Sequence, residues 1–416
     1  MFAIPLILFS LGCSNQQTPK AISGILDLSN FDFGKTSVPL DGEWEFYFET
    51  LLASQRTEID FKQLEPRIVK VPSTWNKLNI RGKLAEGAGY ASYKLKVLLP
   101  EKEEFLAIKI LDSSSSYLLW INNKVVASNG RVGTSKDSYE PEFRPQVTFF
   151  KVGTSPIEII LEVSNFHHSK GGFWESIHIG RAKSITNLQL KKVGYDIFLV
   201  TSLFALSIFL LTYYILKEKI SPILYASILS GLIAFRESLT GERLFLQYFP
   251  SLDWFLLFRF EYLSFFLAVT LFLYYLQRVF FETIPKFLFR TLFSIGLIFS
   301  SLALFLPTKF VSMLILPFQI YTILCIGIYL VLLSKDAIHS VPRAKPFLVG
   351  FLILGITIIH DLLYSYSIIN SIHVSSLGIL LCLAIQSYSI VNEISESNLK
   401  KSPSLISAIR TKYAST

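Results

Sequence analysis

The chain has 416 residues, of which 51% are hydrophobic and 17% are charged, with 36 Phe and 19 Tyr. Its formal net charge is +8, but the basic residues collect beside long apolar segments, which argues against nucleic-acid binding. The three cysteines are Cys13, Cys325 and Cys382. They leave residues 25–183 without a cysteine pair, so a disulfide framework, a zinc site and Cys-based catalysis are excluded there, and no metal or cofactor is expected.

The first residues, MFAIPLILFSLGC, form a short apolar run that ends in small residues and a cysteine. This run resembles a bacterial lipoprotein signal peptide over residues 1–13, with Cys13 as the lipidated residue, and it is not counted as a membrane span. It lacks a basic start and carries Ser10 where Leu is commoner. An ordinary signal peptide or an uncleaved anchor is the alternative. Residues 14–24 are then expected to be a linker.

Residues 25–183 contain short apolar runs separated by turn sequences, which is typical of β-strands. In WEFYFE, for example, alternation puts Trp44 and Phe46 on one face, and Asn-Asn at 122–123 accepts the positive φ of a hairpin turn. About eight strands at this spacing predict an extracytoplasmic all-β sandwich of jelly-roll type. Trp44 and Trp120 are expected in its core.

Five side chains of this domain lie on predicted loops or strand ends where a ligand could bind. Sugars are held by aromatic faces together with convergent polar groups. The candidates for ligand contact are Trp75, Asn165, His168, Lys170 and Trp174. The alternative is that these residues only shape turns.

The second half of the chain contains seven apolar segments, each of about 18 to 24 residues and long enough to span about 30 Å of hydrocarbon. These segments are 193–216, 222–239, 254–276, 288–306, 310–333, 347–369 and 374–394. They predict an all-α seven-helix membrane bundle after the sandwich, with a kink at Pro317. If the N-terminal domain is secreted, seven crossings leave residues 395–416 as a short cytoplasmic tail.

The distribution of basic residues supports this orientation in the cell (inner) membrane, because cytoplasmic loops carry an excess of Lys and Arg. The predicted outer loops contain only Arg243 and Lys309. The predicted inner loops and tail contain Lys217, Lys219, Arg278, Lys286, Arg290, Lys335, Arg343, Lys345, Lys400, Lys401, Arg410 and Lys412.

Motifs in both halves carry a family resemblance. LDGEWEFYF, VPSTWN, SSYLLWINNKVVASNGRVG and VSNFHHSKGGFWESIHIG in the first half, and LIAFRESLTGE, GITIIHDLLYS and GILLCLAIQSYSIVNEI in the second, resemble the 7TMR-DISM receptors. These are bacterial seven-transmembrane receptors with diverse intracellular signalling modules. The first half is also similar to the sugar-binding jelly-roll of family 2 glycoside hydrolases, whose catalytic barrel has no counterpart here, so no enzyme activity is implied.

The resemblance implies a sensory receptor that binds an extracytoplasmic small molecule or glycan and signals across the membrane. Most family members continue into a cyclase, kinase or phosphatase module, whereas about 22 residues follow the seventh segment here. A separate cytoplasmic signalling protein is therefore the expected partner, besides membrane lipid.

Three pairs of ionisable residues lie inside the predicted spans, where charge persists only if it is paired or faces a polar interior. They are Arg236 and Glu237, Arg259 and Glu261, and His360 and Asp361. Helix rise places the three groups at a similar depth in the outer half of the bilayer. Residues two apart on a helix do not face each other, so Arg236 or Arg259 is expected opposite Asp361 or Glu261. Such a network either fixes helix packing or takes part in signalling.

Other functions are less well supported by these residues. An intramembrane enzyme or a transporter-like protein would use the polar site around His360 and Asp361. Asp361 has no second Asp well inside a span, and His360 has too few partners for a zinc site. The seventh segment has no Lys to bind retinal, and seven segments do not divide into the two halves of an inverted repeat.

Overall fold

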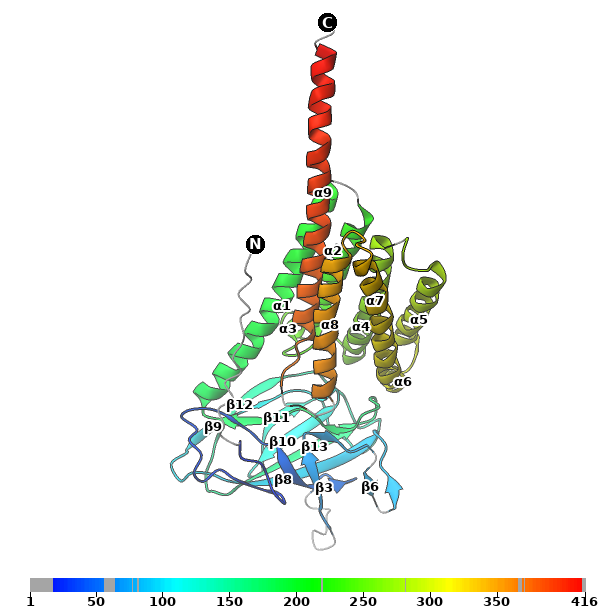
Figure 1. Cartoon of the computed structure of the whole chain (residues 1–416). Helices are drawn as coiled ribbons and strands as arrows, with labels where there is room; N and C mark the ends of the chain where they lie inside the picture. The colour runs from blue at the N-terminus through cyan, green and yellow to red at the C-terminus, as the bar shows by residue number, and fades with distance from the viewer. Residues whose placement is uncertain are drawn as a thin grey trace.

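The computed structural model describes residues 18–55, 64–76, 78–80, 82–217, 220–280, 282–365, 369 and 371–413, with side chains up to residue 396. The predicted lipidation site Cys13 lies outside these residues. The chain forms a strand-rich domain at one end and a helical bundle at the other, and helix α9 points away from the strands (Figure 1).

The strand-rich domain consists mainly of two sheets that enclose one apolar core. The larger sheet has the order β11–β10–β13–β8–β3–β4, with β1 parallel to β8, and the smaller has the order β12–β9–β15–β2. The strands are β1 Ile25–Asp27, β2 Val38–Pro39, β3 Gly42–Phe48, β4 Arg67–Val71, β5 Ser73–Thr74, β6 Asn79–Ile80, β7 Lys83–Leu84, β8 Gly89–Leu98, β9 Phe105–Ile110, β10 Ser116–Ile121, β11 Lys124–Asn129, β12 Gln146–Lys151, β13 Ile157–Asn165, β14 Gly172–Phe173 and β15 His178–Gly180.

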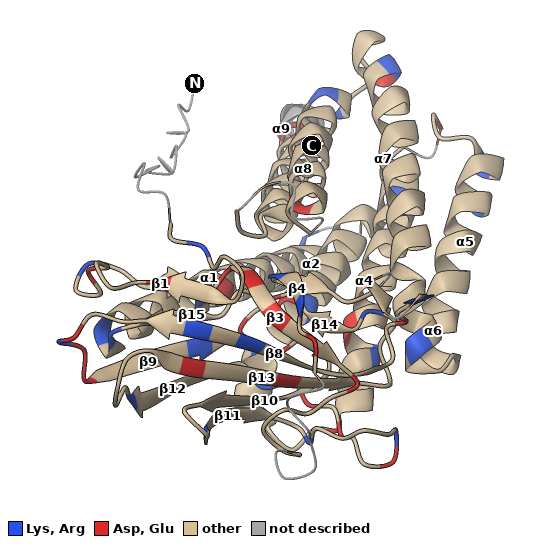
Figure 2. Ribbon diagram, turned by 90° about the horizontal axis from the view of Figure 1, so that it is seen from below, with Lys and Arg blue, Asp and Glu red and all other residues tan. Residues whose placement is uncertain are grey.

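Strand alternation fills this core as predicted for most positions. Trp44 and Phe46 of β3 and Leu95 of β8 are buried. Trp120 is different: Leu119 and Ile121 point inward, so Trp120 between them lies on the outer face of β10 and donates from Nε1 to a Glu162 carboxylate oxygen at 3.0 Å. The prediction that Trp120 is a core residue is therefore wrong. Figure 2 shows charged residues of β3, β8 and β13 on the side of this sheet remote from the helices.

Two local features explain how the sandwich begins and turns. Asn122 and Asn123 have φ of 46° and 65° and connect β10 to β11, as expected for a hairpin turn with positive φ. Ala21, which lies in the predicted linker, is instead part of the core and forms a bridge with Gly42. Gly42 has φ 131°, and a Cβ at this position would lie 2.4 Å from the Ala21 nitrogen, so only glycine permits this approach.

The helical part follows the predicted segments closely. The helices are α1 Ala182–Leu216, α2 Ser221–Leu239, α3 Leu244–Tyr248, α4 Trp254–Val279, α5 Lys286–Phe305, α6 Thr308–Met313, α7 Ile315–Ile338, α8 Ala344–Ser365 and α9 Ser375–Tyr413. α1 starts earlier than predicted because its first turns pack on the smaller sheet. The predicted kink at Pro317 appears as a break at Leu314, since the proline ring would clash with the carbonyl four residues earlier. α9 continues past the predicted seventh segment.

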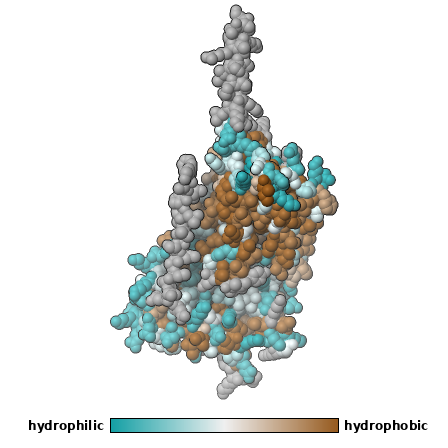
Figure 3. All heavy atoms as spheres, viewed as in Figure 1, coloured by the Kyte–Doolittle hydropathy of each residue, from teal (hydrophilic) through white to brown (hydrophobic). Residues whose placement is uncertain are grey.

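Six stretches of the described chain are long and apolar enough to cross a membrane: Ala182–Leu216, Trp254–Val279, Lys286–Phe305, Thr308–Ile338, Ala344–Ser365 and Ser375–Glu396. The second predicted segment, α2, is not among them. Figure 3 shows a broad apolar band over the bundle, with hydrophilic residues at its far end and over the sandwich.

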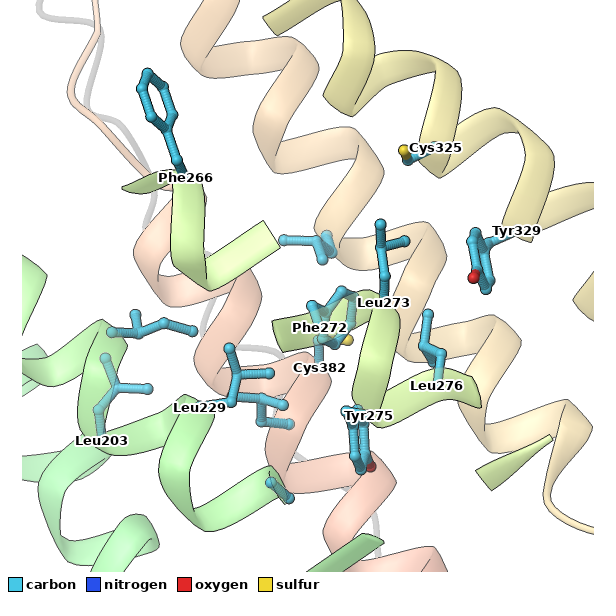
Figure 4. Close-up of a cluster of buried hydrophobic side chains, with 14 of the residues drawn as sticks. Leu203, Leu229, Phe266, Phe272, Leu273, Tyr275, Leu276, Cys325, Tyr329 and Cys382 are labelled. Atoms are coloured by element: carbon cyan, nitrogen blue, oxygen red, sulfur yellow. The ribbon is translucent and has the colours of Figure 1, made fainter. Parts of the chain in front are cut away.

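α4 lies at the centre of the bundle core. Its Phe266, Phe272 and Tyr275, labelled in Figure 4, are buried, and their rings contact aromatic rings of α5, α7 and α8. α8 and α9 approach so closely that a Cβ at Gly378 would lie 2.0 Å from the Thr357 hydroxyl oxygen. Small residues at such crossings let helix backbones pack closely in lipid.

Candidate functional site between the sandwich and the helices

The loop between α2 and α3, residues 240–243, carries an arginine that joins the two parts of the molecule. Arg243 donates from Nε and Nη2 to the two carboxylate oxygens of Asp112, at 2.6 and 3.0 Å. Asp112 follows β9 in the sandwich. From Nη1 the same guanidinium donates to Glu261 Oε2 of α4 at 3.1 Å and to the Leu239 carbonyl at 2.6 Å. Arg243 is 8% exposed, so one nearly buried cation binds carboxylates from both domains.

An aromatic side chain of the sandwich covers this cation. Phe143, from the segment between β11 and β12, is 5% exposed and belongs to the apolar cluster of the helices. The Arg243 guanidinium carbon lies 3.6 Å from the centroid of its ring, and Trp254 of α4 stacks on it at 5.5 Å. Burial alone would lower the pKa of Arg243, but Asp112 and Glu261 outweigh burial and raise it. The arginine is therefore charged at this interface.

A second buried ion pair lies beside the first. Lys109 of β9 donates to Glu242 Oε2 at 2.7 Å and also to the Gln189 side chain of α1. Lys109 is 1% exposed; burial lowers its pKa, and the attraction of Glu242 opposes this effect. The Glu242 amide donates to Asp196 Oδ2 of α1 at 2.8 Å. Gly241 makes room for this turn, because its φ is 60° and a Cβ would lie 2.6 Å from Asp196.

These two pairs connect the sandwich to the bundle through buried charges. Removal of one partner from a buried ion pair leaves an uncompensated charge and typically costs about 3–5 kcal/mol. Both pairs involve the loop at residues 240–243, so β9 and the segment after it are bonded to the loop that follows α2 and, through Arg243, to α4.

Three of the five predicted ligand contacts are buried structural residues. Trp75 is 1% exposed, lies in the sandwich core and donates from Nε1 to the Glu86 carbonyl at 2.9 Å. Asn165 is fully buried, and its amide donates to the carbonyls of Gly87, His168 and Lys170. Neither side chain presents a surface to a ligand. VPSTWN and VSNF therefore shape the loops, as the alternative interpretation held.

His168 is the third buried residue, and it contacts the bundle. Its Nε2 lies 3.1 Å from the Tyr262 hydroxyl of α4, and the next amide, Ser169, donates to the Ser312 hydroxyl of α6 at 2.8 Å. Burial lowers the pKa of His168 to about 4, so its ring is neutral near pH 7. Lys170 is exposed, and Trp174 is half-buried with its ring 5.5 Å from the His168 ring. Residues 166–171 thus form a further connection to the helices.

The acidic residue of the His360–Asp361 pair binds a helix terminus and not an arginine. The Asp361 carboxylate accepts from the amides of Val374 and Ser375, both at 2.8 Å, where α9 begins. The His360 ring lies 3.1 Å from the same carboxylate and 3.0 Å from the Ser371 hydroxyl. Free amides at a helix N-terminus favour a negative charge. The prediction of an arginine opposite Asp361 is therefore wrong.

Arg259 has the complementary role at a helix C-terminus. It donates to the carbonyls of Ala303, Leu304 and Leu306, at 2.7, 2.6 and 3.2 Å, where α5 ends. These carbonyls have no partner within the helix, and a cation there also interacts favourably with the helix dipole. Arg259 thus has no carboxylate partner among the described residues, contrary to the prediction.

Arg236 comes nearest to the predicted cross-helix contact. It donates to the backbone carbonyl of Glu261 at 2.6 Å, and its guanidinium lies 4.5 Å from the centroid of the Phe265 ring. The Glu261 carboxylate is taken by Arg243 instead. Glu237 is hydrogen-bonded to Ser376 at the start of α9.

Comparison with known proteins decides what kind of bundle this is. Residues 193–393 match the family model described as 7TM diverse intracellular signalling. The helical region belongs to this family. The resemblance to the 7TMR-DISM receptors is thereby confirmed for this region, and its membrane-spanning helices make the chain a multi-pass membrane protein.

Among solved structures, the chain is similar to a GH2 beta-galacturonidase from Eisenbergiella tayi, at 15% identity, TM-score 0.24, over 35% of this chain and 24% of the enzyme. It is also similar to a beta-glucuronidase from Ruminococcus gnavus, at 14% identity, TM-score 0.28, over 35% of this chain and 28% of the enzyme. The chain thus covers less than a third of either enzyme. No curated protein matches it.

The residues that join the sandwich to the helices were not among the predicted site residues. Arg243 was noted only as a rare basic residue of an outer loop, and Lys109 was not singled out within its predicted strand. Arg243 could have been identified as a candidate because a basic residue in a predicted outer loop departs from the positive-inside rule. Nothing in the sequence pairs it with Asp112.

Glu175, between β14 and β15, gives this interface a pH dependence. Burial and the neighbouring Asp112 raise its pKa to about 7, against the opposing attraction of Lys192, His373 and Arg243. Tyr364 of α8 also faces it.

The pKa of Glu175 is higher in the folded state than its unfolded value of 4.5. Its contribution to stability is therefore complete below pH 4.5 and is lost as the pH rises through about 7. Glu175→Gln should therefore be more stable than the wild type above the folded pKa, and the gain should shrink as the pH falls. Thermal unfolding of the full chain in detergent, across this window, measures the difference. Glu101→Gln, at an exposed position, is the control. A gain that does not change with pH contradicts the assignment.

Proposed function

We propose that this chain is a bacterial transmembrane receptor whose sandwich binds an extracytoplasmic ligand and whose helices pass the signal to a cytoplasmic signalling protein. The observation that carries the proposal is the shared arginine: Arg243 binds Asp112 of the sandwich and Glu261 of α4 at once. A domain connected in this way moves the helices when it moves. A flexible tether would not transmit a conformational change.

The route from ligand to helices runs through the loop at residues 166–171. We propose that the ligand contacts the exposed Lys170 and the half-buried Trp174, and is a glycan by the resemblance of the sandwich sequence. Trp174 lies against His168, which in turn meets Tyr262 of α4. A ligand that binds better to one position of this loop shifts the population of two helix arrangements by that difference in affinity.

The proposed receptor has seven spans, with a jelly-roll sandwich outside and the end of α9 inside. α2 is the span that completes the seven, in addition to the six long apolar stretches. It packs against α1, α4 and α9, so it needs fewer lipid-facing apolar residues than its neighbours. The two basic residues of the predicted outer loops support the orientation, because both form ion pairs with acidic residues of the sandwich. Arg243 binds Asp112, and the Lys309 amine lies 3.5 Å from Glu86.

An enzyme or a transporter centred on His360 and Asp361 is the weaker alternative. Both Asp361 oxygens already accept amide hydrogen bonds from the start of α9. A carboxylate held in this way serves the bundle's structure, which favours a receptor without enzymatic activity of its own.

Ligand binding is tested by thermal unfolding of the full chain in detergent against a panel of neutral and acidic glycans. The proposal expects at least one glycan to raise the melting temperature, and expects Lys170→Ala combined with Trp174→Ala to abolish the shift. Lys124→Ala, an exposed lysine at the β10–β11 hairpin, is the matched control and should keep it. If no glycan stabilises the wild type, the carbohydrate proposal fails.

The partner is tested separately by affinity capture of the membrane-embedded chain, complete or ended after residue 394. We expect a cytoplasmic cyclase, kinase or phosphatase to be captured by the complete chain and lost or reduced in the shortened one. Recovery of no signalling enzyme by either chain argues against a separate partner.

A further inference from the structure

A cavity of about 340 Å³ lies inside the bundle, between α2, α4, α7, α8 and α9. None of the described residues that line it belongs to the sandwich or to the Arg243 ion pairs. Small-molecule sites typically have volumes of about 300–1,000 Å³ and combine apolar walls with a few polar groups. This cavity has the size for a small ligand and is too small for a two-chain phospholipid.

The polar groups of the cavity gather at the end near the sandwich. Arg236 and Glu237 lie in the last turn of α2, and Gln319 lies in the first turns of α7. Aromatic contacts bring these helices to one level: the Arg236 guanidinium lies 4.5 Å from the Phe265 ring, which is 5.1 Å from the ring of Phe318, the neighbour of Gln319. This end of the cavity is therefore a compact polar chamber.

Its polar groups have unused hydrogen-bonding capacity. Among the described residues, Arg236 donates only from Nη1, to the Glu261 carbonyl, and the Gln319 amide has no hydrogen bond. Within the part of the chain that the structure describes, Glu237 has one hydrogen-bond partner, Ser376. Asp361 also lines the cavity, but its oxygens are occupied by the start of α9. The chamber thus offers donors from Arg236 and Gln319 and acceptors from Glu237 and Gln319.

The rest of the cavity is apolar and elongated. Its walls toward the inner end include Leu273 and Phe272 of α4, Tyr329 of α7 and Phe351 of α8, all nearly buried, and Figure 4 shows the first three between the helices. On α7 the lining extends from Ile315 to Tyr329, roughly 21 Å of helix at 1.5 Å per residue. Ile323, which also lines the cavity, is 46% exposed, so the cavity borders the lipid-facing surface.

A long apolar channel with one polar end fits a single-chain amphiphile. The charges of the chamber determine which head group the amphiphile can have. An anionic head would lie beside Glu237 and a cationic head beside Arg236, and like charges repel each other in both cases. Arg236 and Glu237 attract each other, so a hydroxylated, uncharged head can accept from Arg236 and donate to Glu237 without adding a third charge that would have no partner.

We propose that this cavity binds a single-chain lipid with an uncharged, hydroxylated head, of the monoacylglycerol class, which enters from the bilayer. The head lies among Arg236, Glu237 and Gln319, and the hydrocarbon chain extends toward Phe272 and Phe351. The site lies beyond the proposed receptor function and does not require a sandwich ligand.

The test is photo-crosslinking of the full chain in phosphatidylcholine vesicles with a diazirine-bearing monoacylglycerol of medium chain length. The expected result is saturable labelling of α4, α7 or α8. Unlabelled monoacylglycerol should compete about tenfold better than the fatty acid or the long-chain amine of equal length, because an unpaired charge in the chamber costs upwards of 1.4 kcal/mol. A lysophospholipid in the same competition tests for a zwitterionic head.

Ala268→Phe should fill the cavity and remove the saturable labelling, whereas Ala205→Phe, the same change at an exposed position of α1, should leave it intact. Unfolding temperatures check that both variants fold, and Leu354→Phe replaces Ala268→Phe if the latter does not. Labelling that does not saturate, or that persists in the folded cavity-filling variant, overturns the proposal. Equal or better competition by a charged amphiphile overturns the assignment of an uncharged head.

Discussion

A single buried guanidinium determines how the two halves of this protein relate to each other. Arg243 binds a carboxylate of the sandwich, a carboxylate of α4 and a backbone carbonyl of α2, beneath a phenylalanine contributed by the sandwich. In surroundings of low dielectric, burial of any of these charged groups without its partners would cost several kcal/mol of folding free energy. The sandwich therefore has one favourable position on the helices, and the neighbouring pair of Lys109 and Glu242 selects the same position.

Asp361 and Arg259, within the bundle, have a different role: they bind backbone amides and carbonyls at helix ends that have no partner within their own helix. In hydrocarbon, a free backbone amide or carbonyl has no water to bind. Asp361 supplies an acceptor for the first amides of α9, and Arg259 supplies donors for the last carbonyls of α5. Both residues thus act on a neighbouring helix. This use of charge leaves Arg236 and Glu237 with spare capacity at the cavity, where a ligand can use it.

The sequence was sufficient for the parts of the structure that follow from periodicity. Alternation located Trp44 and Phe46 in the sandwich core, and apolar length located the membrane helices to within a few residues, apart from the early start of α1 and the late end of α9. It was insufficient for contacts between distant segments. Arg259 and Asp361 looked like ion-pair partners because their depths agreed, but depth along a helix does not specify which neighbour a side chain faces. For the same reason the sequence could not pair Arg243 with Asp112, which lie 131 residues apart.

The central claim is that the Arg243–Asp112 contact couples the sandwich to the bundle energetically. A double-mutant cycle with Arg243→Ala and Asp112→Ala, measured as free energies of unfolding of the full chain in detergent, tests it most directly. The account predicts a coupling energy of about 2–5 kcal/mol. The exposed pair of Arg131 and Glu140, also within hydrogen-bonding distance, is the matched control and should couple by about 1 kcal/mol or less. Additivity of the Arg243 and Asp112 changes within about 0.5 kcal/mol would contradict the account.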